Sequence, residues 1–299
     1  MKSNFVNKSL LIIFIVLCSQ INFAQIENAR DEINNLVKHV NGKIGVAVMD
    51  LDNLDTLTVN NDHCFPMQSV YKFPLALAVL SEVDKGNLSL DQEISLTKEN
   101  LFPNTWSPLR EKYQDANIEV KLSEVLEYVV AQSDNNGCDI LFNLIGGPAK
   151  VNEYITGLGI KGISILNTEA EMHKDWNIQY KNCSNPSAMT DLFYKFARKN
   201  ILSSASKDFI WNIMTQNVFG SKRIIGQLPD KTVVAHKTGS SGTNKEGIAA
   251  ATNDAGIVTL PDGKQFAIVV FVSDSPDDAD TRDKIIADIA KIVWDVYSN

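Results

Sequence analysis

The chain has 299 residues, of which 44% are hydrophobic and 21% charged, and its formal net charge at pH 7 is −8. These values predict a globular protein with a core of ordinary size, in one large domain or two closely packed ones. The acidic balance argues against broad nucleic-acid binding, which needs basic stripes, but it permits a local cationic pocket for an anionic ligand.

The first residues have the pattern of an export signal. Lys2 and Lys8 precede an apolar run at residues 10–17, and a short polar stretch follows. Because this run is too short to span a bilayer, we expect a signal peptide that is cleaved after Ala24. The mature protein is then expected in the periplasm without membrane attachment. A retained anchor and a lipid-modified Cys18 are the alternatives.

The rest of the chain has strand patterns at both ends and helical patterns between them. Apolar spacing predicts a helix over residues 26–40 and then two strands of a hairpin at 43–52 and 55–59. The middle is predicted to be helical at residues 69–83, 122–131, 137–145, 149–157, 187–199 and 206–217. Strands return at residues 232–238, 247–259 and 265–274, before a long amphipathic helix at 280–297.

This order predicts an α/β (α+β) fold with a discontinuous architecture. After a signal peptide at residues 1–24, residues 25–64 and 220–299 would form an antiparallel sheet flanked by the terminal helices. Residues 65–219 would form an all-helical domain. We expect a monomer with its functional site at the junction of the two domains, where pockets commonly form.

Three cysteines remain after cleavage of the signal: Cys64, Cys138 and Cys183. An odd number in an exported protein leaves at least one thiol unpaired. Their spacing fits no zinc motif, so we expect buried free cysteines, with a Cys64–Cys138 disulfide as the alternative.

The first of three chemical motifs is Ser69-Val70-Tyr71-Lys72. Ser69 begins a predicted helix and Lys72 follows one turn later, so the two side chains share a face. Serine needs a base to act as a nucleophile, and a lysine desolvated beside other cations can accept its proton. The alternative is a serine that caps the helix, followed by a solvated lysine.

The second motif, Ser133-Asp134-Asn135, lies between two predicted helices. In a catalytic interpretation, Ser133 relays a proton to a leaving nitrogen and Asn135 hydrogen-bonds a substrate amide. Ser, Asp and Asn are also common in turns and helix caps, which is the alternative.

The third motif, Lys237-Thr238-Gly239-Ser240, ends an apolar strand. Lys237 would supply a positive charge for a carboxylate, and Thr238 would add a hydroxyl. Gly239 would allow close backbone approach, and the N–H of Ser240 would form an oxyanion hole with the N–H of Ser69. An exposed edge strand is the alternative. In this order, the three motifs favour acyl transfer on a substrate that carries a carboxylate.

With these motifs, the chain resembles a class A serine β-lactamase over essentially its whole mature length. Trp106-Ser107-Pro108 resembles the segment that walls the family's substrate cleft, and Thr252-Asn253-Asp254 resembles another recurring segment. The resemblance implies the serine β-lactamase/D,D-peptidase-like fold and hydrolysis of a small-molecule β-lactam through an acyl-enzyme on Ser69. It implies no cofactor and no metal, and the scattered histidines form no zinc motif.

The resemblance also assigns a base for deacylation. Residues 167–173 resemble the family's omega loop, in which Glu169 would activate the hydrolytic water; Glu171 is a competing candidate. The base for acylation stays open between Lys72 and Glu169 acting through a water.

Two residues resemble a subgroup of the family, the extended-spectrum cephalosporinases (PER- and CfxA-like). His173 stands where the family usually has asparagine, and Arg223 would assist Lys237 in holding the substrate carboxylate. The resemblance therefore implies a preference for cephalosporins. His236 is expected to pack or to face solvent rather than to catalyse.

Two other functions use the same motifs. A D,D-peptidase or penicillin-binding protein would be acylated and turn over slowly. A non-hydrolytic β-lactam-sensing domain would stay acylated.

Overall fold

A computed structural model describes residues 24–298. The predicted signal peptide, apart from Ala24, and the alternatives proposed for it therefore lie outside the described residues. None of the helices within this range is long and apolar enough to cross a membrane.

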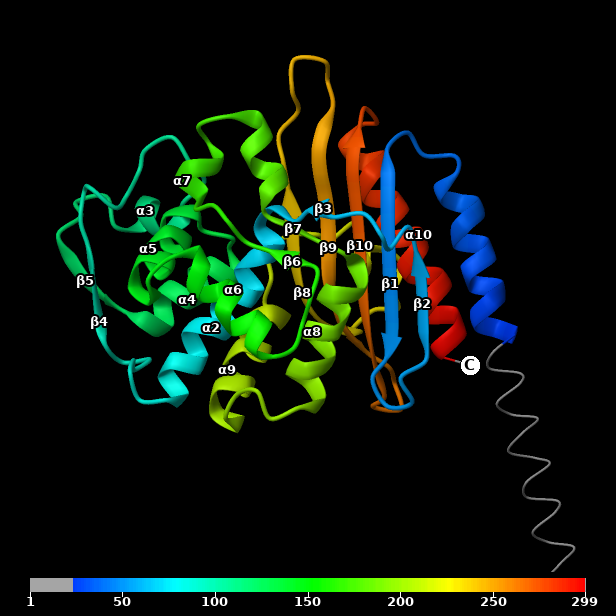
Figure 1. Cartoon of the computed structure of the whole chain (residues 1–299), viewed down its shortest axis with the longest axis horizontal. Helices are drawn as coiled ribbons and strands as arrows, with labels where there is room; N and C mark the ends of the chain where they lie inside the picture. The colour runs from blue at the N-terminus through cyan, green and yellow to red at the C-terminus, as the bar shows by residue number, and fades with distance from the viewer. Residues whose placement is uncertain (1–23, 299) are drawn as a thin grey trace, which may run out of the picture.

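The centre of the fold is a five-stranded antiparallel sheet with the order β2-β1-β10-β9-β8 (Figure 1). Its strands are β1 (Lys43–Asp50), β2 (Thr56–Val59), β8 (Val233–Ser240), β9 (Ala249–Thr259) and β10 (Gln265–Ser275). Because β1 pairs with β10, the two ends of the chain meet in one sheet. The predicted α/β fold with an antiparallel sheet is confirmed.

Alternation along the strands gives the sheet two apolar faces. On β10, Ile268, Val270 and Val272 pack with the terminal helices, while Val269 and Phe271 belong to the cluster formed with the helical part. A period of two is expected where both faces of a strand are covered. The terminal helices are residues 24–37 and α10 (Ala279–Tyr297), which lie on the same face of the sheet (Figure 1).

Helices form the other part of the molecule, which lies against the opposite face of the sheet (Figure 1). They are α2 (Lys72–Asp84), α3 (Pro108–Lys112), α4 (Leu122–Ala131), α5 (Asn135–Ile145), α6 (Pro148–Gly157), α8 (Pro186–Arg198) and α9 (Ser204–Thr215). One apolar cluster continues from these helices onto the sheet. The division into domains at residues 65 and 219 stays a prediction.

Several short elements were not predicted from the sequence. A hairpin pairs β4 (Glu93–Leu96) with β5 (Ile118–Lys121), and a three-stranded sheet has the order β3-β7-β6. The latter contains β3 (Phe65–Pro66), β6 (Ile163–Ser164) and β7 (Cys183–Ser184). The remaining elements are α7 (Glu169–Met172) and the 3₁₀ helices η1 (Gln68–Tyr71), η2 (Trp176–Lys181) and η3 (Ile224–Gln227).

The expectation of buried free cysteines is confirmed for Cys138 but wrong for Cys64 and Cys183. Cys64 and Cys183 form a disulfide with 5.3 Å between their Cα atoms. They meet because β3, which follows Cys64, pairs with β7, which begins at Cys183. Cys138 is the free thiol among the described residues and is buried in α5, so the alternative Cys64–Cys138 bridge is also wrong.

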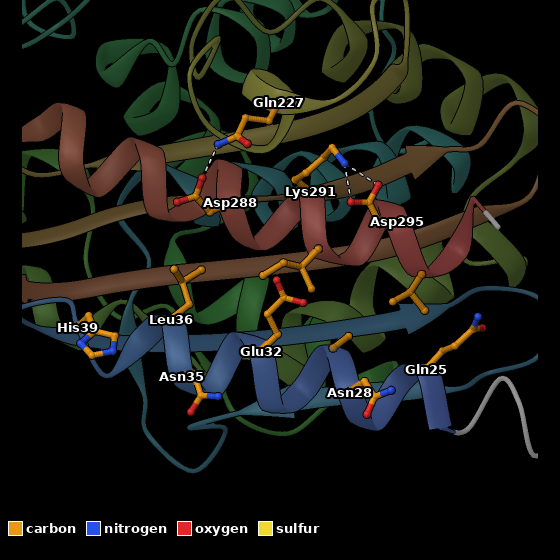
Figure 2. Close-up of a pocket in the computed structure, with 13 residues that line it drawn as sticks. Gln25, Asn28, Glu32, Asn35, Leu36, His39, Gln227, Asp288, Lys291 and Asp295 are labelled. Atoms are coloured by element: carbon orange, nitrogen blue, oxygen red, sulfur yellow. Dashed lines mark hydrogen bonds and ion pairs between the residues drawn. The ribbon is translucent and has the colours of Figure 1, made fainter.

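A groove of about 670 Å³ lies between the N-terminal helix and α10 (Figure 2). Lys291 pairs with Asp295 along its wall, and Gln227 donates a hydrogen bond to Asp288. None of its lining residues belongs to the predicted site. The chemical motifs instead meet at a smaller cavity, between the helical part of the molecule and the end of β8.

Candidate active site

A cavity of about 300 Å³ opens between the segment around α7 and the end of β8. Its lining includes five of the predicted site residues: Ser69, Asn135, Glu169, His173 and Ser240. Four separate stretches of the sequence therefore contribute to one concave surface, as a ligand site requires.

Ser69 lies in η1, and the α-helix begins only at Lys72, so the predicted helix start at Ser69 is wrong. The preceding residue, Gln68, has φ +47°, which is uncommon outside glycine. Asn253 holds this turn against the sheet, because its Nδ2 donates to the carbonyls of Pro66 at 2.7 Å and Met67 at 3.1 Å.

Gly239 allows β8 to pass directly beside this turn. A Cβ atom at Gly239 would lie 2.4 Å from the carbonyl oxygen of Met67 and 3.2 Å from the backbone nitrogen of Ser69. The contact with Met67 is too close for any Cβ atom, and the contact with Ser69 would be tight. The close backbone approach expected from the third motif is confirmed.

Lys72 is fully buried and connects the motifs to one another. Its Nζ donates to the carbonyl of Ser133 at 2.8 Å and to Oδ1 of Asn135 at 2.5 Å. The same nitrogen forms an ion pair with Oε1 of Glu169 at 3.1 Å. A solvated surface lysine is therefore excluded.

Asp134 and Ser133 have different tasks in the second motif. Asp134 caps α5 by accepting from the N–H of Gly137 at 2.8 Å, and it also accepts from the N–H of Leu109 at 2.7 Å. Burial raises the pKa of this carboxyl. The capping interpretation thus holds for Asp134. Ser133 instead has φ +56°, a strained conformation for serine that the caps on either side maintain.

Lys237 is fully buried beside Ser133. Its Nζ donates to Oγ of Ser133 at 3.1 Å and to the carbonyl of Thr238 at 3.0 Å. Burial, and then the positive charge of Lys72, hold the pKa of Lys237 well below its ordinary value. Although β8 is an edge strand, Lys237 and Thr238 are buried, so the exposed-strand alternative fails at these residues.

Arg223 lies beside the end of β8 and is held on several sides. Its Nε donates to Asp283 at 2.7 Å, and its Nη2 donates to Oγ of Ser240 at 2.7 Å. Its Nη1 donates to the carbonyl of Asn253 at 2.9 Å. The guanidinium is thereby fixed next to the exposed side chain of Ser240, which lines the cavity.

Glu169 and Glu171 are distinguished by their partners. Glu169 is only 7% exposed, and its Oε1 accepts from the hydroxyl of Tyr71 at 2.7 Å as well as pairing with Lys72. Glu171 is part of a capping box, in which its carboxylate accepts from the N–H of Thr168 at 2.9 Å. Glu171 is therefore occupied in starting α7, and Glu169 is the carboxylate that lines the cavity.

Asp139 holds the backbone of Glu169, a role that the sequence analysis missed. Its two carboxylate oxygens accept from the N–H of Glu169 at 2.7 Å and from the N–H of Ala170 at 2.9 Å. Burial raises the pKa of Asp139 to about 6. An acid within the apolar stretch of α5 from Cys138 to Phe142 was the available signal, because such a residue needs a partner.

His173 reaches across to the opposite segment through Thr105, which was also missed. The Nε2 of His173 lies 3.0 Å from Oγ1 of Thr105, which accepts from Nδ2 of Asn135 at 2.7 Å. A second cavity of about 470 Å³ lies against these residues and shares Asn135, Glu169 and His173 with the first. The Thr105–His173 contact therefore forms part of a partition between the two cavities.

Trp106 and His236 lie outside the cluster around Lys72. Trp106 is 51% exposed, donates from Nε1 to the carbonyl of Gln132 at 2.9 Å and packs edge-on against Phe219. His236 is buried and pairs with Asp254, with 2.8 Å between Nδ1 and Oδ1. Of the two positions expected for His236, packed or facing solvent, the structure shows the packed one.

The comparisons with known proteins agree with this geometry. Residues 28–297 match the model of the β-lactamase enzyme family. β-Lactamase VEB-1 of Pseudomonas aeruginosa is 48% identical over 98% of each chain, and the extended-spectrum β-lactamase PER-1 of the same organism is 41% identical over 91% of this chain and 88% of its own.

Solved structures agree as well. The crystal structure of the TLA-1 extended-spectrum β-lactamase superposes with a TM-score of 0.90 at 52% identity, covering 91% of this chain and 99% of the other. The chain belongs to the β-lactamase enzyme family and is a class A serine β-lactamase.

Proposed function

We propose that this β-lactamase opens the β-lactam amide through an acyl-enzyme on Ser69, and that Lys72, Ser133 and Glu169 carry the proton transfers. The observation that carries the proposal is the position of Lys72. Its buried Nζ contacts the backbone of Ser133, the side chain of Asn135 and the carboxylate of Glu169 at once. Such convergence of titratable groups beside a nucleophile is typical of acyl-transfer sites.

In acylation, Ser69 Oγ bonds to the β-lactam carbonyl carbon while its proton leaves to Lys72, or to Glu169 through a water. Ser133 then gives its proton to the departing ring nitrogen. Lys237, whose pKa is lowered by burial and by Lys72, donates to Ser133 Oγ and supports this relay. The backbone N–H groups of Ser69 and Ser240, both beside the cavity, would stabilise the oxyanion.

In deacylation, Glu169 takes a proton from a water whose oxygen bonds to the acyl carbonyl carbon. The ester bond to Ser69 then breaks, and Oγ recovers a proton. Two observations support this role. Glu169 is only 7% exposed, and its backbone N–H is held by Asp139. A general base must be held in this way within hydrogen-bonding reach of its water.

Substrate binding falls to the groups around this centre. Lys237, Thr238 and Arg223 would hold the substrate carboxylate, because a lysine and an arginine lie beside the end of one strand. Asn135 would hydrogen-bond the substrate side-chain amide. Trp106 and His173 would flank the opening, where both are exposed.

Cephalosporins are the proposed preferred substrates. The chain is 48% identical to VEB-1 and 41% identical to PER-1, and PER-1 and TLA-1 are known as extended-spectrum β-lactamases. His173, in contact with Thr105 at the partition, is the residue that we connect with this preference.

The sequence is the basis for three further proposals, on export, oligomeric state and domain division. We propose that residues 1–24 are a signal peptide, that the mature enzyme acts as a monomer in the periplasm, and that residues 65–219 form the helical domain. The disulfide between Cys64 and Cys183 supports export, because disulfides persist in oxidising compartments.

The test is turnover of a chromogenic cephalosporin by the mature protein, followed by intact mass, alongside Ser69→Ala and Glu169→Ala. We expect sustained turnover in the unmutated protein, none in the Ser69 variant, and a trapped acyl adduct in the Glu169 variant. A stable adduct without turnover in the unmutated protein would instead identify a peptidase or a sensor.

A further inference from the structure

The carboxylate of Glu169 is bound unequally at its two oxygens. Oε1 accepts from the hydroxyl of Tyr71 at 2.7 Å and lies 3.1 Å from Nζ of Lys72. Within residues 24–298, no hydrogen-bond donor contacts Oε2. One oxygen therefore already has two partners, while the other has no hydrogen-bond donor among the described residues.

We propose that Tyr71 is a positioning residue that gives the two oxygens of Glu169 different tasks. Oε1 is the anchored atom, and Oε2 is the atom that takes the proton from the deacylating water. The inference rests on the proposed role of Glu169 as the base for deacylation. It adds a residue that acts through Glu169 and does not touch the substrate.

Tyr71 is suited to hold this hydrogen bond. Its side chain is fully buried in η1, and its ring stacks on Phe142 with 5.8 Å between the ring centroids. Burial raises the pKa of its hydroxyl well above the ordinary value, so the group remains a donor at every pH at which the enzyme works. The aromatic ring has only two side-chain torsions, and packing fixes both.

A thiol behind Tyr71 supports the direction of the hydrogen bond. The Sγ of Cys138 lies 3.5 Å from the tyrosine hydroxyl oxygen, and burial raises the pKa of the thiol well above its ordinary value. The protonated thiol donates to the oxygen of Tyr71, which leaves the tyrosine proton for Glu169. Hydrogen bonds in such a series strengthen one another.

The chemical step balances as in ordinary ester hydrolysis. The water gives one proton to Oε2 of Glu169, and its oxygen bonds to the acyl carbonyl carbon. The bond from that carbon to Oγ of Ser69 then breaks, and the proton returns to Oγ, so that Glu169 ends ionised. Tyr71 keeps its own proton throughout and only fixes the carboxylate plane.

The hydrogen bond from Tyr71 orients the carboxylate of Glu169 but also makes it a weaker base. A hydrogen bond to the ionised form of a carboxylate lowers its proton affinity. Removing the tyrosine hydroxyl should therefore make Glu169 easier to protonate and also let its carboxylate rotate. The rotation slows deacylation at every pH, whereas the easier protonation removes the ionised base only on the acid side and so moves the pH dependence.

Of the other titratable groups near Glu169, only Cys138 loses a hydrogen-bond partner in this change, because its thiol donates to the tyrosine oxygen. Lys72 faces it from α2, Cys138 and Asp139 from α5, and Lys237 from β8. His173, on the residue after α7, is directed to Thr105. Asp139, with a pKa raised to about 6, contributes to the acid side of the profile in both proteins. A difference between the two profiles then reports the hydroxyl of Tyr71.

The experiment compares Tyr71→Phe with the unmutated enzyme and with Tyr154→Phe. Tyr154 on α6 is a matched control, because its buried hydroxyl has no hydrogen-bond partner among residues 24–298. Each protein is tested for kcat between pH 4.5 and 9, melting temperature, and the fraction carrying an acyl adduct by intact mass during turnover.

For Tyr71→Phe, we expect the acid limb of kcat to move up by about one pH unit and kcat at its optimum to fall about fivefold. The acyl adduct should accumulate during turnover, since deacylation is the slowed step. Tyr154→Phe should match the unmutated enzyme. A merely structural role would lower the melting temperature without moving the acid limb or enriching the adduct, and that result would overturn the inference.

Glu169→Gln separates this inference from the proposed function. If Glu169→Gln traps the adduct while Tyr71→Phe keeps the unmutated pH profile and adduct fraction, the role of Tyr71 is wrong and that of Glu169 stands. If Glu169→Gln turns over like the unmutated enzyme, both are wrong.

Discussion

The two walls of the catalytic cavity are built in different ways. On one wall, Lys237, Thr238 and Ser240 belong to β8, which pairs continuously with β9 from Val233 opposite Thr259 to Ser240 opposite Thr252. On the other wall, Glu169 and His173 lie in a segment that returns between β6 and β7 with only short helical turns of its own.

On this second wall, hydrogen bonds between side chains and the backbone replace the strand pairing that holds β8. Asp139 binds the backbone of Glu169 and Ala170, and Asn182 accepts through Oδ1 from the N–H groups of Leu166 at 2.8 Å and Asn167 at 2.9 Å. The Cys64–Cys183 disulfide fastens the end of the segment. Under the proposed mechanism, changing one side chain on the β8 wall removes a substrate contact, whereas changing one behind the other wall moves the proposed base, Glu169.

The largest expected effect comes from forcing the β8 wall away from the nucleophile. In Gly239→Ala, the new Cβ would lie 2.4 Å from the carbonyl of Met67, so the strand or η1 must shift. We expect kcat/KM to fall at least about a hundredfold, because a shift of about 1 Å at reacting groups has that effect. The free energy of unfolding should fall by about 1–3 kcal/mol.

Gly157→Ala is the matched control for that substitution. Gly157 ends α6, and a Cβ there would contact nothing within 4 Å. Activity should be unchanged and stability equal or slightly higher, because alanine favours the helix by up to about 1 kcal/mol. Retention of full kcat/KM in Gly239→Ala would show that the two segments are not rigidly apposed.

On the opposite wall, Asp139→Asn should lower kcat roughly 10- to 100-fold, the effect of losing a hydrogen bond to a charged acceptor. An amide offers only one acceptor oxygen, so one of the N–H groups of Glu169 and Ala170 loses its partner. Steady-state kinetics and the acyl-adduct fraction measure the loss.

The pH dependence of Asp139 has a definite sign. Burial raises its pKa from 3.8 to about 6, so between those values the folded state binds more protons than the unfolded chain. The ionised carboxyl therefore costs folding free energy above about pH 6, and stability on this account falls as pH rises through the window. Asp139→Asn removes that cost, so its melting temperature at pH 7.5 should not fall although kcat does. A parallel loss of both would indicate unfolding instead of misplacement of Glu169.

The contrast between the walls also explains what could be predicted from sequence. Helix and strand positions followed from apolar periodicity, because both faces of the sheet and the helix α2 are deeply buried. The motif residues were identified because their types carry chemistry. The supports behind Glu169 have no such signature.

Three of these supports show why. Tyr71 was named only as a member of the first motif, and a role for its hydroxyl follows only from Glu169, 98 positions later, lying beside it. Asp139 and Thr105 likewise act on partners distant in sequence. The Cys64–Cys183 pairing depends on β3 meeting β7, two strands of two residues each, which are too short to be predicted from periodicity.

Arg223→Ala should raise KM for a cephalosporin about tenfold, with a smaller effect on kcat, if the β8 wall mainly binds the carboxylate. Asp283→Asn should have the opposite sign, because Asp283 partly neutralises the guanidinium at 2.7 Å and asparagine keeps an acceptor for its Nε. Michaelis–Menten constants at two ionic strengths test both, and an unchanged KM in Arg223→Ala would remove this residue from the binding site.

The smallest effect is expected at the contact between Thr105 and His173. Thr105→Val removes the hydroxyl that accepts from Asn135 and lies 3.0 Å from Nε2 of His173, while keeping the side-chain shape. His173→Ala should change kcat/KM for a bulky oxyimino cephalosporin by about threefold, the loss of one neutral hydrogen bond, and Thr105→Val should have a somewhat larger effect because it also removes the acceptor for Asn135. Because both variants break the same contact, the double variant should be no worse than the poorer single one. Additive losses in this cycle would mean that the two residues act on the substrate separately, and that the partition between the cavities has no part in substrate choice.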